Sequence, residues 1–498
     1  MKKIVERLTT RTFHSCINGL AVEGNESQSL ISPFNGEAWG HVTWSLEQVD
    51  LAVDSAAQAV RSSEWLDLTR QQRADVLDQI GRGVEAHVEE IASLETLANG
   101  KPLKSTMAEV LVSVRWWQYY ASLLRTQRDE EIELSAAKSG RIRHESVGVV
   151  ALITPFNGAF SLGTWKLAPA LAAGNVVILK PPLNSPGSSL MLQKIVLEAG
   201  VPAECFQVLQ GGADVGTQLI ADSRVNMVSF TGSTAAAKRI GAVVTGRLAR
   251  FVAEAGGKSA HIVFDDANLS NAVTAVVQGA FSGTGQTCVA GSRVLVHRDV
   301  SAEFVSLLLE RIARLRLGDP LSAETHLGPI ATAEQYERIR ELVRDATSEG
   351  ARVLAGGTEP PAMPDNLASG YWLQPTVLSV EHNTNIICRT EVFGPVLTIQ
   401  EFGTESEALS IANDSEFGLA AGFWTADMRR AHQMSRGLQA GTVWVNTYRG
   451  MDWQTPFGGY KLSGLGRENG VEGLREFQQV KAVIQEFGAT TDPFEIVS

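Results

Sequence analysis

The chain has 498 residues, of which 44% are hydrophobic and 20% are charged, and its formal net charge at pH 7 is -12. This composition is typical of a soluble globular protein with enough chain for about three domains. The acidic balance argues against nucleic acid or an anionic membrane as a partner, because phosphate groups are bound by clustered lysine and arginine.

The first residues, Met1-Lys-Lys-Ile-Val-Glu-Arg-Leu8, contain no apolar core of signal-peptide length. No apolar run in the chain reaches the ~18 residues of a membrane span. The cysteines are too few and too dispersed for a disulfide framework, which favours a reducing compartment: Cys16, Cys205, Cys288 and Cys388. We therefore expect a cytoplasmic protein. Because the histidines and cysteines show no ligand spacing, we expect no metal.

Between residues 147 and 257 the chain alternates apolar, β-rich runs with segments of helical length. This βαβ series predicts a parallel sheet that binds ligands at the carboxyl ends of its strands, although the Gly-x-Gly-x-x-Gly dinucleotide fingerprint is absent. We expect strands at 147–154, 175–180, 205–210, 226–230 and 251–253, and a helix at 188–199 that ends before Gly200 and Pro202. A second α/β region follows, with an amphipathic helix expected at 302–315 and a turn-rich break at 350–358.

Asn157 and Glu254 stand where two of the predicted strands end. Asn157 lies in the turn of Ile153-Thr-Pro-Phe-Asn-Gly158, and its amide can donate a hydrogen bond to an oxyanion. Glu254 lies in Phe251-Val-Ala-Glu-Ala-Gly-Gly-Lys258, where an apolar setting would raise its pKa and make it a general base. Taken singly, the first motif is more typical of an ordinary Asn-Gly turn and the second of a surface glutamate.

Cys288 lies between small residues in Phe281-Ser-Gly-Thr-Gly-Gln-Thr-Cys-Val-Ala-Gly-Ser-Arg293. A thiolate attacks carbonyl carbon readily, and Gly283 and Gly285 let backbone N–H groups approach the charge that develops. A cysteine taken alone is more often a small buried hydrophobe. The two motifs upstream favour the nucleophile.

Together these motifs resemble the aldehyde dehydrogenase superfamily, with Phe156 where the family has Trp and Ala255 where it has Leu. Further similar motifs follow in order along nearly the whole chain: Phe230-Thr-Gly-Ser-Thr234, Glu391-Val-Phe-Gly-Pro395, Gly441-Thr-Val-Trp-Val-Asn446 and Pro456-Phe-Gly-Gly-Tyr-Lys-Leu-Ser-Gly-Leu-Gly-Arg-Glu468.

The resemblance implies an α/β fold with a Rossmann-like cofactor domain, an α/β catalytic domain and a small β oligomerisation arm. It places the NAD(P)-binding domain at 1–126 and 147–256, the catalytic domain at 257–464, and the arm and C-terminal segment at 127–146 and 465–498. The alternating residues Gly140-Arg-Ile-Arg-His-Glu-Ser146 suit an edge that pairs with another subunit in a homodimer or homotetramer. A solvated hairpin explains the same alternation equally well.

The resemblance also implies the chemistry. Cys288 would attack an aldehyde, the Asn157 amide and the Cys288 N–H would hold the oxyanion, and hydride would pass to the nicotinamide. Glu254 would then activate water to hydrolyse the thioester and release a carboxylic acid. Members that transfer the acyl group to coenzyme A generally lack this glutamate, so its presence favours hydrolysis over acyl transfer and over a binding or structural role.

For the cofactor, the resemblance assigns contacts to Ile153, Thr154, Phe156, Lys180, Phe230, Gly232, Ser233, Glu391 and Phe393. Many NAD-using members carry a ribose-binding glutamate where this chain has Leu183. A carboxylate that would repel a 2′-phosphate is therefore missing there, and the choice between NAD and NADP stays open.

For the substrate, a small-molecule aldehyde, the resemblance points to a tunnel lined by Gly158, Trp165, Ser282, Arg449, Met451 and Phe457. Gly158 and Ser282 are small, which indicates a roomy pocket that admits a semialdehyde or a bulky catabolic aldehyde. The apolar members are equally typical of core, and Arg449 either favours a polar or anionic distal group or lies on the surface.

Overall fold

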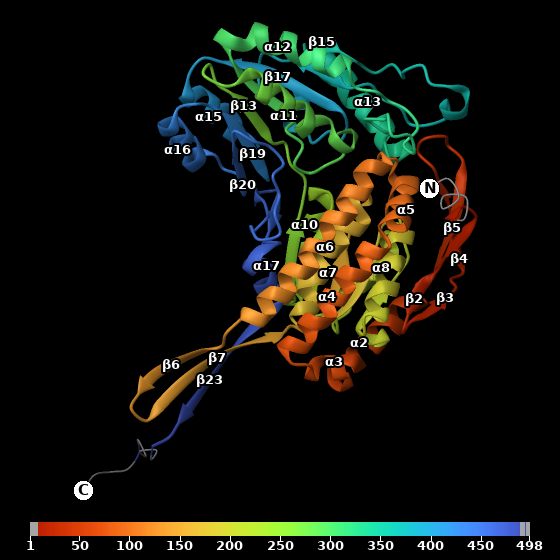
Figure 1. Ribbon diagram of the computed structural model, residues 1–498, viewed down its shortest axis with the longest axis vertical. Coiled ribbons are helices and arrows are strands. Elements are labelled where there is room, and N and C mark those ends of the chain that lie inside the picture. The colour runs from red at the N-terminus through yellow and green to blue at the C-terminus, as the bar shows by residue number, and fades with distance from the viewer. Residues whose placement is uncertain (1–7, 489–493, 495–498) are drawn as a thin grey trace.

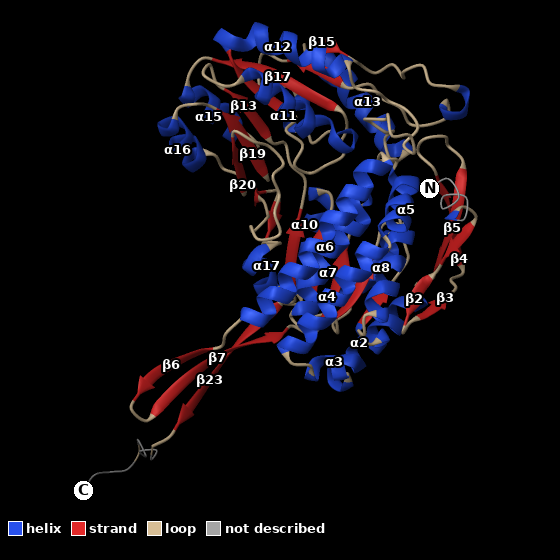
Figure 2. Cartoon of the chain, viewed as in Figure 1, coloured by secondary structure: helices blue, strands red, loops and turns tan. Residues whose placement is uncertain are grey.

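The computed structural model describes residues 8–488 and Phe494, so residues 1–7, 489–493 and 495–498 of the predicted domains lie outside the described part. Two large sheets, each covered by helices, form the body of the molecule, and a narrow β arm extends away from it (Figure 1). Figure 2 shows that helices and strands alternate through both parts of the body.

Sheet I has the strand order β22-β12-β11-β8-β9-β10-β2-β3. Its parallel strands are short, apolar and almost wholly buried, as expected for a sheet covered on both faces: β8 (Val149–Ile153), β9 (Val176–Lys180), β10 (Phe206–Val208), β11 (Met227–Thr231) and β12 (Arg250–Glu254). The chain runs outward from β8 through β9 to β10 and then returns to β11 and β12 on the other side of β8. The loops after β8 and β11 therefore diverge, and this switch point is where such sheets bind ligands.

Two groups of helices pack on sheet I. Because parallel crossovers are right-handed, the helices that follow β8 and β9 cover one face and those that follow β10 and β11 cover the other. The first group is α4 (Arg70–Ala86), α5 (Val88–Asn99), α6 (Leu103–Thr126), α7 (Ala159–Ala172) and α8 (Gly187–Glu198). The second is α2 (Glu47–Ser62), α9 (Ala213–Ala221) and α10 (Thr234–Gly246), with the short α3 (Glu64–Asp67) after α2.

The N-terminal segment extends sheet I and adds a small sheet of its own. The strands β2 (Ser15–Ile17) and β3 (Leu20–Val22) join the edge at β10 in antiparallel fashion. The strands β1 (Arg11–Phe13), β4 (Glu26–Ile31) and β5 (Ala38–Trp44) pair with one another at the right of Figure 1.

Sheet II has the order β15-β16-β17-β14-β13-β19-β20, in which only the edge strand β15 is antiparallel within the described residues. Its strands are β13 (Ala260–Val263), β14 (Arg293–His297), β15 (Arg352–Ala355), β16 (Thr376–Ser379), β17 (Val396–Phe402), β19 (Ala420–Trp424) and β20 (Thr442–Val445). Its helices are α11 (Leu269–Phe281), α12 (Arg298–Ala313), α13 (Ala333–Ser348), α14 (Ile386–Arg389), α15 (Glu405–Asn413) and α16 (Met428–Gly437).

The C-terminal part returns to sheet I and then enters the arm. The strands β18 (Phe417–Gly418) and β21 (Tyr460–Lys461) pair with each other, β22 (Gly464–Leu465) pairs with β12, and α17 (Gly470–Glu476) packs on α7. The arm consists of β6 (Glu130–Ser135), β7 (Lys138–Ser146) and β23 (Gln478–Glu486), in the order β23-β7-β6.

The predicted α/β fold with a β arm is confirmed, and each predicted strand and helix occurs close to its expected bounds. The helix expected at 302–315 begins earlier, at Arg298, where the His297 side chain accepts a hydrogen bond from the Asp299 N–H. The turn-rich break expected at 350–358 is partly wrong, because residues 352–355 form β15. This short edge strand pairs with β16 through an irregular register, and its brief apolar run gave no clear strand pattern.

The predicted domain boundary after residue 256 falls between β12 and β13, which belong to different sheets. By contrast, Gly464, the last residue of the predicted catalytic domain, pairs with Glu254 of sheet I. The division into domains remains a prediction.

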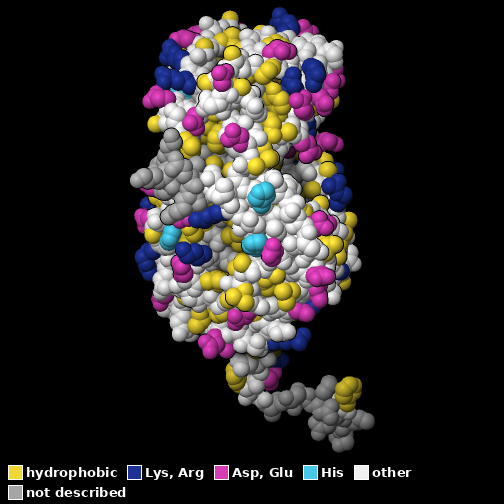
Figure 3. Space-filling model, turned by 90° about the vertical axis from the view of Figure 1, so that its right-hand side faces the viewer, with side chains coloured by type: hydrophobic (Ala, Val, Ile, Leu, Met, Phe, Trp, Pro, Cys, Tyr) yellow, Lys and Arg dark blue, Asp and Glu magenta, His cyan; other side chains and the backbone are white. Residues whose placement is uncertain are grey.

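On the face that carries the N-terminal sheet, acidic, basic and apolar side chains are interspersed over the described residues (Figure 3). In residues 8–488, no helix combines the length and apolar character needed to cross a membrane.

Candidate active site

The crevice between the two sheets contains one cavity of about 440 Å³ that collects the predicted catalytic and substrate residues. Its wall includes the three predicted catalytic residues, Asn157, Glu254 and Cys288. All six predicted substrate residues also line it: Gly158, Trp165, Ser282, Arg449, Met451 and Phe457. Sheet I contributes the residues after β8 and the last residue of β12, whereas the region of sheet II contributes the loops after α11 and β20.

Cys288 lies in a turn between η3 (Ser282–Gly285) and β14, where its side chain is partly exposed to the cavity. Burial raises the pKa of the Cys288 thiol to about 12, and the carboxylates of Glu391 and Glu254 add to the rise. The Arg449 guanidinium and a hydrogen bond from the Val289 backbone lower this pKa. At neutral pH the thiol is therefore protonated and needs a base when it attacks.

Glycines let the backbone pack closely around the loop that carries this cysteine. A Cβ at Gly257 would lie 2.6 Å from the Cys288 carbonyl oxygen, and one at Gly285, where φ is +70°, would collide with the Gly394 carbonyl. The loop is fixed by Gln286, whose Oε1 accepts from the Ala331 N–H at 2.9 Å. Cys288 thus lies on a turn that larger residues would disrupt.

Asn157 lies in η1 (Phe156–Gly158), directly after β8. Its Nδ2 donates to the Gln286 carbonyl oxygen at 3.0 Å, which ties it to the loop that carries Cys288. An asparagine amide has two N–H donors, so the second is available to an oxygen in the cavity.

Glu254 is the last residue of β12 and only 3% exposed. Neither of its carboxyl oxygens has a hydrogen-bond partner among the described residues. Burial raises the pKa of Glu254 well above its ordinary value, and the neighbouring Glu468 carboxylate adds to that rise. A carboxyl group with free oxygens and a raised pKa is suited to accept a proton from water or a thiol near neutral pH.

Sequence reasoning missed an ion pair beside this carboxyl group. Lys166 of α7 and Glu468 are both almost fully buried and in direct contact, and Lys166 Nζ also donates to the Ser229 hydroxyl at 3.0 Å. A single lysine within the apolar segment Trp165-Lys-Leu-Ala-Pro-Ala-Leu171 was the available signal. The partner was hidden because it lies 302 residues away in the sequence.

One wall of the cavity is aromatic. Trp116 and Trp165 stack with ring centroids 5.0 Å apart, and Phe457 meets Trp165 edge-on at 5.6 Å. Trp116 also donates its indole N–H to the Asn469 side chain at 2.7 Å. The sequence left open whether Trp165 and Phe457 are core residues or line the substrate pocket. Both descriptions hold, because these residues are buried in the core and also form the wall of the cavity.

The switch point of sheet I carries the predicted pyrophosphate residues. Gly232 and Ser233 follow β11 and precede α10, where the Ser233 hydroxyl accepts from the Ala236 N–H at 3.3 Å. A Cβ at Gly232 would lie 2.5 Å from the ring of Phe230, so only glycine fits there. The free N–H groups at the start of this 13-residue helix suit an anionic group.

Lys180 and Leu183 lie at the carboxyl end of the neighbouring strand β9. Lys180 Nζ donates to the Pro181 carbonyl oxygen at 3.2 Å, and burial lowers the pKa of Lys180 to about 8, opposed by Asp214. Leu183 packs near Gly212, whose Cβ would lie 3.7 Å from it. The Lys180 ammonium group and the apolar Leu183 side chain thus both lie at one edge of the predicted cofactor site.

Glu391 and Phe393 reach the crevice from sheet II. Glu391 Oε1 accepts from the Gly257 N–H at 3.1 Å, and burial raises the pKa of Glu391 to about 7. Phe393 meets Phe156 edge-on at 5.7 Å, next to Ile153 and to Thr154, whose buried hydroxyl has no partner among the described residues. These groups fit a dinucleotide that spans the crevice from β9 to the cysteine loop.

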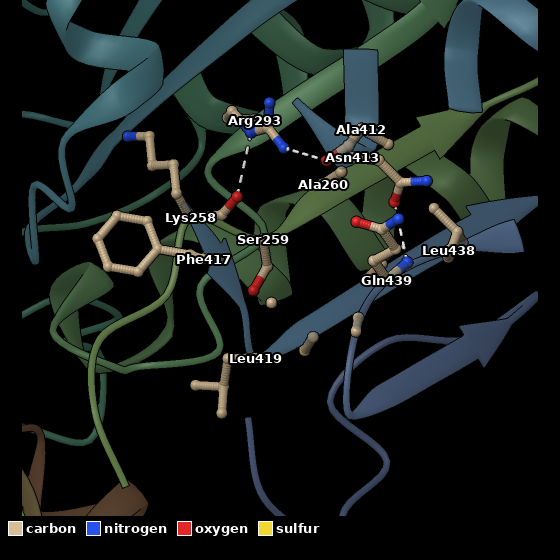
Figure 4. A pocket seen from close by; sticks show the side chains of 14 residues that line it. Lys258, Ser259, Ala260, Arg293, Ala412, Asn413, Phe417, Leu419, Leu438 and Gln439 are labelled. Atoms are coloured by element: carbon tan, nitrogen blue, oxygen red, sulfur yellow. Dashed lines mark hydrogen bonds between the residues drawn. The ribbon is translucent and has the colours of Figure 1, made fainter. Parts of the chain in front are cut away.

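A second cavity, of about 20 Å³, lies beside Lys258 and Arg293 (Figure 4). Arg293 donates to the carbonyl oxygens of Lys258 at 3.0 Å and Ala412 at 2.7 Å, so it links the segment after β12 to helix α15. The space suits about one water molecule and is too small for a substrate. Across residues 8–488 and Phe494, no three His, Cys, Asp or Glu side chains form a group that could hold a metal ion.

Comparison with known proteins gives concordant matches. A model of the aldehyde dehydrogenase family matches residues 21–483. A betaine aldehyde dehydrogenase of Brucella melitensis is 36% identical over 481 residues, which cover 96% of this chain and 98% of that protein. The structure of betaine aldehyde dehydrogenase from Staphylococcus aureus in complex with NAD+ is similar with a TM-score of 0.95 and 32% identity, covering 99% of each chain. An NAD-dependent aldehyde dehydrogenase from Sinorhizobium meliloti is similar with a TM-score of 0.95 and 31% identity, covering 98% of this chain and 97% of that one.

Proposed function

Because the chain belongs to the aldehyde dehydrogenase family and is an NAD(P)-dependent aldehyde dehydrogenase, we propose that it oxidises its aldehyde to a carboxylic acid through a thioester on Cys288. The observation that carries this proposal is the shared cavity of Cys288, Asn157 and Glu254. A nucleophile, an amide donor and a carboxyl group with free oxygens are the groups that acyl chemistry followed by hydrolysis requires.

The first step forms a bond between Cys288 Sγ and the aldehyde carbon. Since burial keeps the pKa of the Cys288 thiol high, its proton must leave as the bond forms, and it passes to solvent water. The carbonyl oxygen becomes an oxyanion, to which the second N–H of Asn157 and the Cys288 backbone N–H donate.

The nicotinamide, when bound, accepts the hydride that converts this adduct to a thioester. Glu254 then takes a proton from a water molecule as the water attacks the thioester carbon. The carbon–sulfur bond breaks to release the acid, and Glu254 passes its proton to the sulfur, which restores the thiol. In sum, aldehyde, water and NAD(P)+ give carboxylate, NAD(P)H and two protons. Glu254 also supports hydrolysis over transfer to coenzyme A, because acyl transfer needs no base for water.

We propose NAD or NADP as the cofactor, bound by the β9 and β11 loops, Phe156, Glu391 and Phe393. The relative from Staphylococcus aureus binds NAD+. Leu183 brings no carboxylate against a 2′-phosphate, whereas Asp214 lies close enough to act on Lys180. The local charges therefore admit both cofactors.

The substrate is a small-molecule aldehyde, and the volume of about 440 Å³ together with Gly158 and Ser282 supports one with several carbon atoms, such as a semialdehyde. The matched relative of Brucella melitensis that is named for betaine aldehyde is 36% identical, and this similarity alone does not name the substrate of this chain.

We also propose that the chain forms a homodimer or homotetramer in the cytoplasm. Every residue of β6 is exposed, and the arm presents apolar side chains that a second copy would cover: Ile132, Leu134, Val480 and Ile484. All of the described cysteines are free thiols, as a reducing compartment would keep them.

The test follows NAD(P)H formation with aliphatic, aromatic and acidic aldehydes, with each cofactor in turn and with or without coenzyme A. Reduction without coenzyme A, with one acid formed for each NAD(P)H, supports the proposal. Iodoacetamide should abolish this activity, and cofactor or aldehyde should protect against it. Reduction that requires coenzyme A would contradict the hydrolytic route.

A further inference from the structure

Arg449 places a guanidinium group in the wall of the active-site cavity, and within the described ranges no carboxylate lies at salt-bridge distance from it. Among the described residues, its one hydrogen bond runs from Nη1 to the Ser282 carbonyl oxygen at 3.5 Å, the outer limit for such a bond. A largely buried guanidinium without a charged partner is unfavourable unless another group satisfies it.

The backbone of the loop is strained at Arg449. Arg449 has φ +60°, a left-handed conformation that strains a residue with a side chain. The preceding Tyr448 anchors the loop, because it is buried, donates to the Val289 carbonyl oxygen at 3.1 Å and stacks on His261 at 4.4 Å. A strained backbone that points a guanidinium into a reaction cavity indicates a role for the side chain.

The other charged groups of the cavity wall leave the charge of Arg449 without a paired counter-charge. Burial lowers the pKa of Arg449 and the Glu109 carboxylate opposes this by favouring the charged form, but Glu109 Oε2 is itself paired with Lys101 Nζ at 2.5 Å. Glu468 is paired with Lys166, and burial raises the pKa of Glu254, which favours its neutral form. While Glu254 carries its proton, the cavity wall therefore has a net positive charge, and this charge lies on Arg449.

The aromatic wall does not offset this charge. The faces of Trp116 and Trp165 are stacked on each other, and both rings are less than 9% exposed. A cationic substrate would find little free aromatic face and would meet Arg449. An anionic group would instead gain charge-assisted hydrogen bonds from the planar guanidinium.

We propose that Arg449 selects aldehydes with a carboxylate at the far end from the aldehyde, that is, semialdehydes of dicarboxylic acids. This inference rests on the proposed function and names the substrate class of the same site. It also distinguishes this chain from the relatives named for betaine aldehyde, whose substrate carries a positive charge.

The experiment measures kcat/KM for the semialdehydes of the linear dicarboxylic acids from malonic to adipic, for the methyl ester of each, and for betaine aldehyde. The ester masks the charge and retains the carbon chain. The proteins are the wild type, Arg449→Gln, Arg449→Lys and the control Arg115→Gln. Arg115 suits as a control because it is exposed on α6 and, among the described residues, hydrogen-bonds only Gln118. Circular dichroism and Tm establish that each variant is folded.

The readout is the ratio of kcat/KM for acid and ester, because Arg449 also lowers the pKa of Cys288 and its loss would slow both substrates alike. We expect the wild type to prefer the best semialdehyde over its ester and over betaine aldehyde. Arg449→Gln should reduce the ratio by about tenfold to a hundredfold, the usual effect of a hydrogen bond to a charged group. Arg449→Lys should restore part of it, and Arg115→Gln should leave it unchanged.

A wild type that oxidises acid and ester equally well, or a ratio unchanged in Arg449→Gln, would overturn the selectivity while the proposed function stands. A wild type that oxidises none of the aldehydes with either cofactor would overturn the proposed function itself. If Arg449→Gln does not fold, the proposed selectivity is tested by the acid-to-ester ratio of kcat/KM in the wild type and in Arg449→Lys. Equal kcat/KM for acid and ester in the wild type would then overturn it.

Discussion

Replacement of Glu254 by glutamine separates the two halves of the proposed reaction. Neither carboxyl oxygen of Glu254 has a hydrogen-bond partner among the described residues, so the isosteric amide breaks no hydrogen bond to them. The oxidation step should still occur, with Lys166 and Glu468 in place, but hydrolysis should lose its base. General-base catalysis contributes about 10²–10⁴-fold, or roughly 2.7–5.5 kcal/mol of barrier, so turnover should fall by that amount.

The assay is rapid-mixing measurement of NAD(P)H in Glu254→Gln. We expect a burst of up to one equivalent per subunit, followed by a slow steady state, because the thioester accumulates. The wild-type rate of hydrolysis should rise with pH as Glu254 loses its proton. Since burial raises the pKa of Glu254, this rise should lie at higher pH than for a free glutamate, and it should be absent in the variant.

Stability provides an independent check. A carboxyl group whose pKa is raised in the folded state stabilises the fold fully below its unfolded pKa, and that stabilisation is lost as pH rises through the folded pKa. Glu254→Gln should therefore match or exceed the wild-type Tm at neutral pH, with a difference that grows as pH increases. A variant with wild-type turnover and no burst would refute the role of Glu254.

Further predictions concern the oxyanion, the cofactor and the arm. Asn157→Ala should lower kcat by about 10²–10³-fold in a folded protein, because one oxyanion donor is lost, and near-normal kcat in steady-state assays would contradict that role. Leu183→Glu should lower kcat/KM for NADP more than for NAD, because the new carboxylate repels a 2′-phosphate; equal effects on both cofactors would place the ribose elsewhere. Val480→Lys combined with Ile484→Lys should shift the oligomer toward smaller species in sedimentation experiments without loss of helical signal, and an unchanged mass would exclude the arm as the interface.

The strands of sheet I and the ends where the site lies were predictable, because buried parallel strands are continuous apolar runs and motif residues follow them directly. Asn157, which follows β8, and Glu254, which ends β12, are of this kind. Cys288 was predictable because it lies in a glycine-rich loop downstream of these two motifs. The parts that could not be predicted depend on contacts between distant segments. The pairing of β2 with β10, and of Lys166 with Glu468, leaves no local pattern in the sequence.

The location of Arg449 is a second feature that the sequence alone could not predict. Its position in the motif after β20 was evident, but whether it lay on the surface or in the cavity depended on the turn that Tyr448 anchors and on the pairing of Glu109 with Lys101. Such a choice is made by tertiary packing. A specific role for Arg449 in substrate selection could therefore be proposed only from the structure that surrounds it.

The central claim is a thioester on Cys288, and mass spectrometry of Glu254→Gln quenched after reaction with aldehyde and NAD(P)+ tests it most directly. We predict that the peptide containing Cys288 gains the mass of the aldehyde less two hydrogen atoms, as a thioester requires. An unmodified Cys288 peptide after NAD(P)H has formed, or the same adduct on Cys16, Cys205 or Cys388, would contradict the account.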